Sequence, residues 1–160
     1  MTLTEAQKIL TEQFNQLGAE LGMTGKPVTV SPGWWTKLVY IMYEGHALQM
    51  EISTEYVDLH MYAVRCIDGK IPASEIYLKY PDGSWYRKCV TEIYGADSAP
   101  EYGDGGNDCS KSMSEQKWNE FLAWYSDDNV SAHMFKMFEY YRDIIFRDPN
   151  VLLTFLRSIE

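Results

Sequence analysis

The side chains of this chain that are best suited to nucleophilic or metal chemistry are its three histidines and three cysteines. They are His46, His60, His133, Cys66, Cys89 and Cys109. A cysteine nucleophile needs a histidine within reach, yet none of these thiols lies in a local catalytic signature. Cys66 and Cys89 fall in expected strands, where buried thiols act as small apolar side chains. A pairing of Cys109 with a histidine is the remaining nucleophilic alternative.

Metal and phosphate binding also lack support from residue spacing. His46, His60 and Asp58 could supply metal ligands, but nothing in the sequence holds all three at one point, and the cysteines lack CxxC spacing. The acidic segment 96–108 lacks both the closing glutamate of an EF-hand and the lysine of a P-loop. No pair of carboxylates is marked by an apolar pocket. We therefore expect no cofactor and no enzymatic activity, with an enzyme whose site assembles from scattered residues as an open alternative.

Length, composition and charge narrow the classes of function. The chain has 160 residues, of which 46% are hydrophobic and 14% aromatic, enough for one continuous core in a single domain spanning residues 1–160. Its formal net charge of −9 repels phosphate backbones and anionic membrane surfaces and attracts basic proteins. We expect neither nucleic acid nor membrane as a partner. The odd number of cysteines and the polar N-terminal residues predict a cytoplasmic protein.

The order of helical and strand-like patterns predicts an α+β fold. Residues 2–21 have helical spacing of apolar side chains, with Thr2 and Glu5 as a capping box and Gly22 as the stop. A period of two then predicts strands at residues 28–31, 37–44, 46–53, 57–66, 75–80 and 85–94. The short turns between them leave no room for crossover helices, so we expect an antiparallel meander of about five strands. Alternation within 46–53 predicts one buried and one solvated sheet face.

The C-terminal part of the chain predicts helices packed on one face of the sheet. Residues 95–111 have no periodicity and are expected to form a surface loop. Ser112 and Glu115 offer a second capping box for a helix that ends near Ser126, and residues 127–129 separate it from a third helix. Asp148-Pro149 ends that helix and begins another, with aspartate as the N-cap.

Negative charge is concentrated in two stretches that contain no lysine or arginine, residues 44–58 and 96–108. Two acidic patches that adjoin in space would focus a negative potential of several kT; a solvated loop and an exposed strand face would produce the same pattern. Exposed tyrosines beside such acids would anchor a protein interface. The predicted partner-binding residues are Asp97, Glu101, Tyr102, Asp104, Asp108, Glu44, Glu51, Glu55 and Asp58.

The chain resembles the immunity proteins of bacterial toxin–immunity pairs, including those of contact-dependent growth inhibition systems. The resemblance is carried by the meander 37–94 with its turns at 68–69 and 81–85, by the acidic segments and by the C-terminal helices. It implies a small, cofactor-free, antitoxin-like protein that binds a cognate basic toxin domain, often a nuclease, and neutralises it by occlusion. The alternatives are an adaptor or regulatory module that binds a different protein, and an enzyme with a non-motif site.

The four acids of the loop give a first testable prediction. Neutralising Asp97, Glu101, Asp104 and Asp108 together should slow association with a basic partner and weaken its dependence on salt, because steering depends on charge. Stopped-flow binding at several salt concentrations measures both quantities. An unchanged association rate in the quadruple variant would contradict the prediction.

Overall fold

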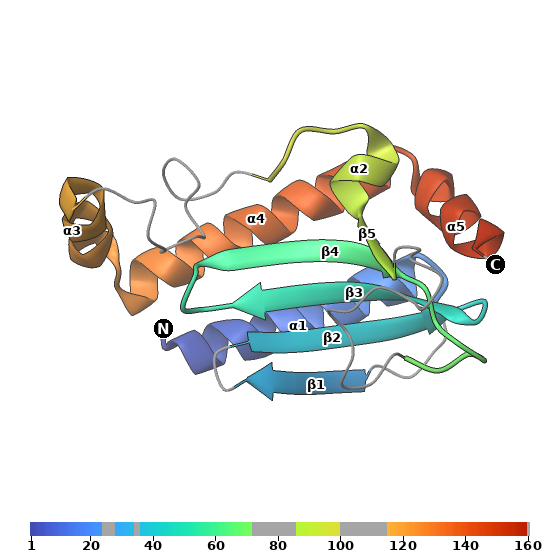
Figure 1. The fold of residues 1–160 in the computed structure, drawn as a ribbon, viewed down its shortest axis with the longest axis horizontal. Helices are drawn as coiled ribbons and strands as arrows, with labels where there is room; N and C mark the ends of the chain where they lie inside the picture. The colour runs from blue at the N-terminus through green and yellow to red at the C-terminus, as the bar shows by residue number, and fades with distance from the viewer. Residues whose placement is uncertain (24–27, 34–35, 72–85, 100–114, 160) are drawn as a thin grey trace.

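The computed structural model describes residues 1–23, 28–33, 36–71, 86–99 and 115–159. It shows the predicted α+β order of an N-terminal helix, a sheet and C-terminal helices (Figure 1). The elements are α1 (Leu3–Glu20), β1 (Val28–Gly33), β2 (Thr36–Tyr43), β3 (His46–Ser53), β4 (Asp58–Val64), β5 (Arg87–Cys89), α2 (Val90–Tyr94), α3 (Glu115–Trp124), α4 (Asp127–Arg147) and α5 (Pro149–Ser158).

Local sequence signals set both ends of α1. The Oγ1 atom of Thr2 accepts a hydrogen bond from the Glu5 N–H at 3.1 Å, and a Glu5 carboxylate oxygen accepts one from the Thr2 N–H at 3.0 Å. This reciprocal pair satisfies two backbone donors that the first turn leaves unpaired. Gly22 follows the helix with a φ of 77°, a left-handed conformation that glycine adopts readily. The predicted helix and its capping box are confirmed.

The five strands form one antiparallel sheet in the order β1-β2-β3-β4-β5, which confirms the meander. Glu44 and Gly45, both with positive φ, make a two-residue turn between β2 and β3, and this turn pairs Tyr43 with His46. At the outer edge, the pairing of β1 with β2 shifts register between Val30 and Gly33, and Pro32 lies within this irregularity. The strand predicted at 75–80 lies outside the described residues.

The strand predicted at 85–94 is wrong in its second half. β5 covers only Arg87–Cys89 and pairs with the last residues of β4, and the chain then turns into the short helix α2. The β-branched side chains after Cys89 favour a strand, but packing of α2 against α4 and α5 outweighs that preference. The Tyr94 hydroxyl supports this packing: it donates to the Asp148 carbonyl oxygen at 2.9 Å and accepts from the Leu152 N–H at 3.2 Å.

The main core lies between the sheet and the helices α1 and α4, which run along one side of it in Figure 1. It contains the predicted apolar faces of β3 and β4, and α1 and α4 add their buried stripes. Gly18 lets α1 lie close to the sheet, because a Cβ atom there would overlap the Ile41 side chain. The fully buried side chains at the centre include Leu10, Phe14, Leu17, Leu48, Met50, Ile52, Leu59 and Met61.

The opposite face of the sheet is not solvated in the way that the alternation predicts. Gln49 and Ser53 are buried on it, because this face has a second apolar cluster of its own. Gln49 is satisfied there, since its amide donates to the Tyr40 hydroxyl at 2.8 Å and accepts from Arg87 at 2.9 Å. The second cluster consists of Leu38, Tyr40, Ala47, Val64, Cys66 and Tyr86.

The C-terminal helices follow the prediction with one correction. Residues 127–129 are the first turn of α4 rather than a separator, because the Ser126 hydroxyl caps the helix by accepting from the Asn129 N–H at 3.1 Å. Asp148 caps α5 as predicted, accepting from the Asn150 N–H at 3.2 Å, with Pro149 next. Ser112 of the expected capping box lies outside the described residues. In the described part of the chain, no helix combines the length and apolar character needed to cross a membrane.

Candidate functional site

The structure separates the predicted acidic residues. Glu44 lies in the β2–β3 turn and Glu55 in the β3–β4 turn, so these two exposed carboxylates are at opposite ends of β3. Asp97 is exposed after α2, where its carbonyl oxygen accepts a hydrogen bond from the Tyr140 hydroxyl at 2.6 Å. The stretch 44–58 is therefore not one continuous acidic patch. The remaining predicted residues, Glu101, Tyr102, Asp104 and Asp108, lie outside the described residues.

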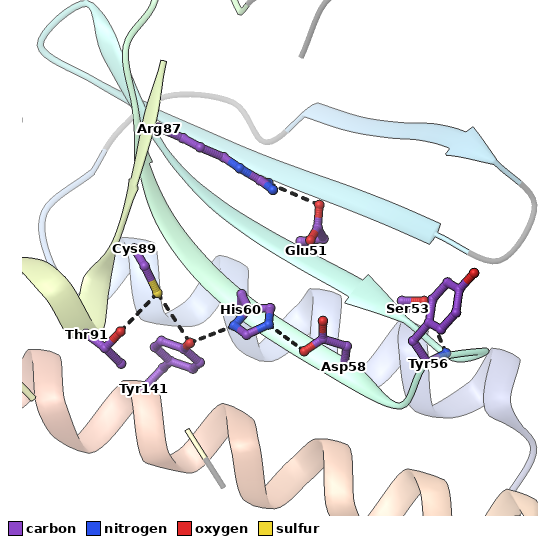
Figure 2. Close-up of polar contacts among 9 residues, drawn as sticks. All are labelled: Glu51, Ser53, Tyr56, Asp58, His60, Arg87, Cys89, Thr91 and Tyr141. Carbon is purple, nitrogen blue, oxygen red and sulfur yellow. Dashed lines mark hydrogen bonds and ion pairs between the residues drawn. The ribbon is translucent and has the colours of Figure 1, made fainter. Parts of the chain in front are cut away.

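Two of the predicted acids have partners within the chain. An oxygen of Glu51 lies 3.0 Å from a guanidinium nitrogen of Arg87, and Asp58 Oδ1 lies 2.6 Å from His60 Nε2 (Figure 2). The Glu51 and Asp58 side chains are only 15% and 19% exposed. Their charges are thus largely compensated inside the molecule and contribute less to its outer potential than Glu44, Glu55 and Asp97.

A surface at one end of the molecule combines exposed apolar side chains with acids. Figure 1 places α3, the β3–β4 turn and the start of α4 at the same end, and a 2.8 Å hydrogen bond from the Tyr125 hydroxyl to the Thr54 carbonyl oxygen joins them. Tyr56, Trp118 and Leu122 are 39%, 37% and 51% exposed on these segments. We call this region the α3 surface; its acids are Glu55, Glu115, Glu120, Asp127 and Asp128.

The charge of the α3 surface is negative overall. Residues 115–128 contain four acids and one lysine, and Glu55 adds a further acid from the neighbouring turn. Asp128 is 3.3 Å from the N-terminal ammonium group, an exposed pair that is screened by solvent. Exposed aromatic side chains and acids are thus present at the same end of the molecule, and protein interfaces combine aromatic anchors with a polar rim.

Apart from the α3 surface, the structure contains a cluster of polar side chains around Cys89, which the sequence did not predict. We call it the Cys89 site. The Thr91 hydroxyl donates a hydrogen bond to Cys89 Sγ at 3.1 Å, and the Tyr141 hydroxyl lies 3.5 Å from the same sulfur. His60 Nδ1 lies 3.0 Å from that Tyr141 oxygen, and Asp58 pairs with the other ring nitrogen of His60. Figure 2 shows Asp58, His60, Tyr141 and Cys89 as one chain of polar contacts.

The shortness of β5 explains how this site forms. β5 pairs with β4 only over Tyr62–Val64, so among the described residues no strand pairs with the outer edge of β4 near His60. The register Tyr62↔Cys89 places the thiol on the same sheet face as His60. Tyr141 comes from α4, which packs alongside β4, and its hydroxyl bridges the imidazole and the thiol. Strand β4, helix α4 and the β5–α2 junction thus meet at one point.

The electrostatics of this site favour a thiolate paired with an imidazolium. Burial alone would lower the pKa of His60, but Asp58 and Cys89 outweigh it and raise that pKa to about 10. Burial alone would raise the pKa of Cys89, but its interactions with His60, Thr91 and Tyr141 lower it to about 7. Burial raises the pKa of the Tyr141 hydroxyl, which therefore keeps its proton. Chemically, the site can hold a nucleophilic sulfur next to a proton donor.

The two described cysteines therefore differ. Cys66 is buried, and burial raises the pKa of its thiol to about 11, which confirms its role as a small apolar side chain. The same interpretation holds for Cys89 only in part: its side chain packs against the main core, but Cys89 is only partly buried and its sulfur contacts two hydroxyl groups. The contact between Asp58 and His60 could have been predicted from the sequence, because residues two positions apart in a strand lie on the same face of the sheet. Cys109 lies outside the described residues.

Replacing His60 with asparagine should raise the pKa of Cys89 from about 7 toward its ordinary value of 9.0. The variant removes the imidazolium that stabilises the thiolate. The ultraviolet absorbance of the thiolate, followed against pH in a Cys109→Ser background, measures the midpoint. Cys66, with its pKa of about 11, serves as the internal reference. An unchanged midpoint would contradict the role of His60.

The same shifts predict how stability varies with pH. The contribution of His60, whose pKa is raised from 6.5 to about 10, is fully present below 6.5 and is lost as pH rises through 10. The contribution of Cys89, whose pKa is lowered from 9.0 to about 7, is fully present above 9.0 and is lost as pH falls through 7. Urea unfolding at a series of pH values should show both losses. His60→Asn should remove the alkaline loss and reduce the acid one, because it also returns the pKa of Cys89 toward 9.0.

No cluster of three or more metal-ligating side chains forms within the described ranges. His46 does not approach the Cys89 site, because its Nδ1 accepts the Cys66 N–H at 3.0 Å and its Nε2 lies 3.0 Å from the Ile159 carbonyl oxygen. Comparisons of the chain with protein-family models, with curated proteins and with solved structures find no match. The features that bear on function are therefore the α3 surface and the Cys89 site.

Proposed function

We propose that the chain is an antitoxin-like binding protein that docks a basic protein domain on its α3 surface and neutralises it by occlusion. The observation that carries the proposal is the exposure of Tyr56, Trp118 and Leu122 among acids at one end of the molecule. The resemblance to immunity proteins supplies the partner class, a bacterial toxin domain, and the cytoplasm as the place of binding.

Charge favours a cationic partner. The chain has a formal net charge of −9, and the acids of the α3 surface add a local negative field that would steer a basic domain toward it. The apolar side chains would then supply desolvated contacts, since tryptophan and tyrosine are frequent among the residues that dominate binding energy. Carboxylates that face lysines and arginines of a nuclease would occupy the positions of its substrate's phosphates.

The backbone of the β3–β4 turn supports a functional role for this end. Val57 has a φ of 52°, which is unusual for a β-branched residue, and its side chain is fully buried. A strained position of this kind persists only when the surrounding structure holds it, and such positions are enriched at functional sites. Burial of Val57 fixes the turn that presents Glu55 and Tyr56 to solvent.

Capture from a native lysate with wild type and with Trp118→Ala/Leu122→Ala tests the proposal. We expect wild type to retain a stoichiometric basic protein, and the double variant to bind it at least about 30-fold more weakly, because each truncated anchor costs about 1–2 kcal/mol. Ile67→Ala is the matched control, since Ile67 is an apolar residue 55% exposed in a different turn. Isothermal titration with the captured protein gives the affinities.

Three outcomes would contradict the proposal: capture of an acidic partner, equal binding by the wild type and the double variant, or equal loss in Ile67→Ala. The activity of the captured protein separates an antitoxin from an adaptor. An antitoxin abolishes the catalytic activity of its partner at a one-to-one ratio, whereas an adaptor leaves that activity in place.

A further inference from the structure

The Cys89 site has the parts that thiol oxidation needs and has no task in the proposed docking function. We propose that Cys89 is a modification site for small hydroperoxides, which oxidise its thiolate to a sulfenic acid. The proposal rests on the hydroxyl groups of Thr91 and Tyr141, which lie beside the sulfur of this partly buried cysteine, and on His60, which contacts the Tyr141 hydroxyl. It is independent of the α3 surface, so the two proposals can fail separately.

Geometry favours attack by this sulfur. Two hydroxyl groups lie within hydrogen-bonding distance of Sγ, at 3.1 Å and 3.5 Å, and hold it in a fixed position at the end of β5. Cys89 is only partly buried, and hydrogen peroxide is a small reactant. A thiol that ionises near the ambient pH combines a substantial thiolate fraction with good nucleophilicity. The pKa of Cys89, lowered to about 7, meets that condition, and the buried Cys66 does not.

The polar chain also supplies the proton that the reaction consumes. The thiolate attacks one peroxide oxygen, so the S–O bond forms while the O–O bond breaks, and sulfur loses the two electrons that the peroxide gains. The leaving hydroxide takes the Tyr141 hydroxyl proton, which His60 replaces across the 3.0 Å contact. With hydrogen peroxide, the products are the sulfenic acid of Cys89, one water molecule and a neutral His60.

Several other ionisable groups face the site and enter its dependence on pH. Arg87 lies over the Tyr62 ring at 3.8 Å, and both share the sheet face of Cys89. Arg87 is paired with Glu51, so its charge is largely balanced. The groups that face Cys89 are Asp58, His60 and Tyr62 from β4, Glu51 from β3, Arg87 from β5 and Tyr141 from α4.

Trapping with dimedone, which reacts with sulfenic acids, tests the proposal on the full chain in a Cys109→Ser background. Hydrogen peroxide is the oxidant, and peptide mapping by mass spectrometry locates the adduct. We expect Cys89 to be labelled at least about tenfold faster than Cys66 in the same molecule, with a rate that rises with pH around 7. Equal labelling of the two cysteines would overturn the proposal.

Variants of the network separate activation from mere exposure. Tyr141→Phe removes the bridging hydroxyl, and we expect it to slow oxidation of Cys89 about tenfold. Tyr140→Phe is the matched control on the same helix, because its hydroxyl donates to the Asp97 carbonyl oxygen instead. Thr91→Val removes the hydroxyl that donates to the Cys89 sulfur, and we expect it to slow oxidation as well. This variant tests the proposal if Tyr141→Phe does not fold. Unchanged oxidation in every folded network variant would overturn the proposal.

Discussion

Replacing Phe14 with alanine should lower the free energy of unfolding by about 3–5 kcal/mol. The total free energy of unfolding of a domain is only about 5–15 kcal/mol, so this loss is a large part of it. Phe14 is fully buried in the main core, where α1 lies against the sheet. The truncation removes apolar burial and leaves a cavity that the surrounding side chains fill only in part. Urea unfolding followed by circular dichroism measures the change.

Gln13→Ala is the control for this prediction. Gln13 is the exposed neighbour of Phe14 on α1, and exposed substitutions of this kind change stability by no more than about 0.5 kcal/mol. A loss below about 1 kcal/mol in Phe14→Ala would show that α1 is not essential to the core. The sheet and α4 would then have to form a stable core without α1.

Replacing Arg87 with methionine should lower the free energy of unfolding by about 2–4 kcal/mol. The substitution leaves Glu51 and the Gln49 amide oxygen without their common donor on a largely buried sheet face. Removal of one member of a fully buried ion pair costs about 3–5 kcal/mol, and the 15–16% exposure of these side chains reduces that cost. Chemical unfolding at neutral pH gives the value.

Two further variants isolate the cause. Glu51→Leu added to Arg87→Met should restore most of the lost stability, because no uncompensated carboxylate remains. Arg142→Met should cost less than about 1 kcal/mol, since its pair with Glu20 has the same 3.0 Å separation but side chains 43% and 35% exposed. Equal losses in Arg87→Met and Arg142→Met would refute the role of burial.

Features encoded by neighbouring residues could be predicted from the sequence. The capping box of Thr2 and Glu5, the short turn between the strands predicted at 37–44 and 46–53, and the N-cap at Asp148 each depend on a few consecutive residues, and all three are confirmed. The path after Cys89 could not be predicted this way. Its β-branched residues favour a strand, and only packing against α4 and α5, far along the chain, makes them helical.

The candidate sites show the same limit. Asp58 and His60 lie two residues apart on one strand, so their contact follows from local geometry. Tyr141 is 52 residues from Cys89, and their contact requires both a short β5 and an α4 placed alongside β4. Likewise, Glu51 pairs with Arg87, which lies 36 positions away in the sequence, and this pairing could not be predicted from the neighbouring residues. The immunity-type function stays a prediction, which the binding experiment addresses.

The irregular first strand bears on how the molecule behaves at high concentration. Among the described strands, β1 is the outermost on its side of the sheet, where unpaired backbone groups could recruit a strand from another molecule. Pro32 has no N–H to offer, and the register shift beside it bends the border away from a regular ladder. This border is a poor template for cross-molecule strand addition, which protects an aromatic-rich chain against ordered aggregation.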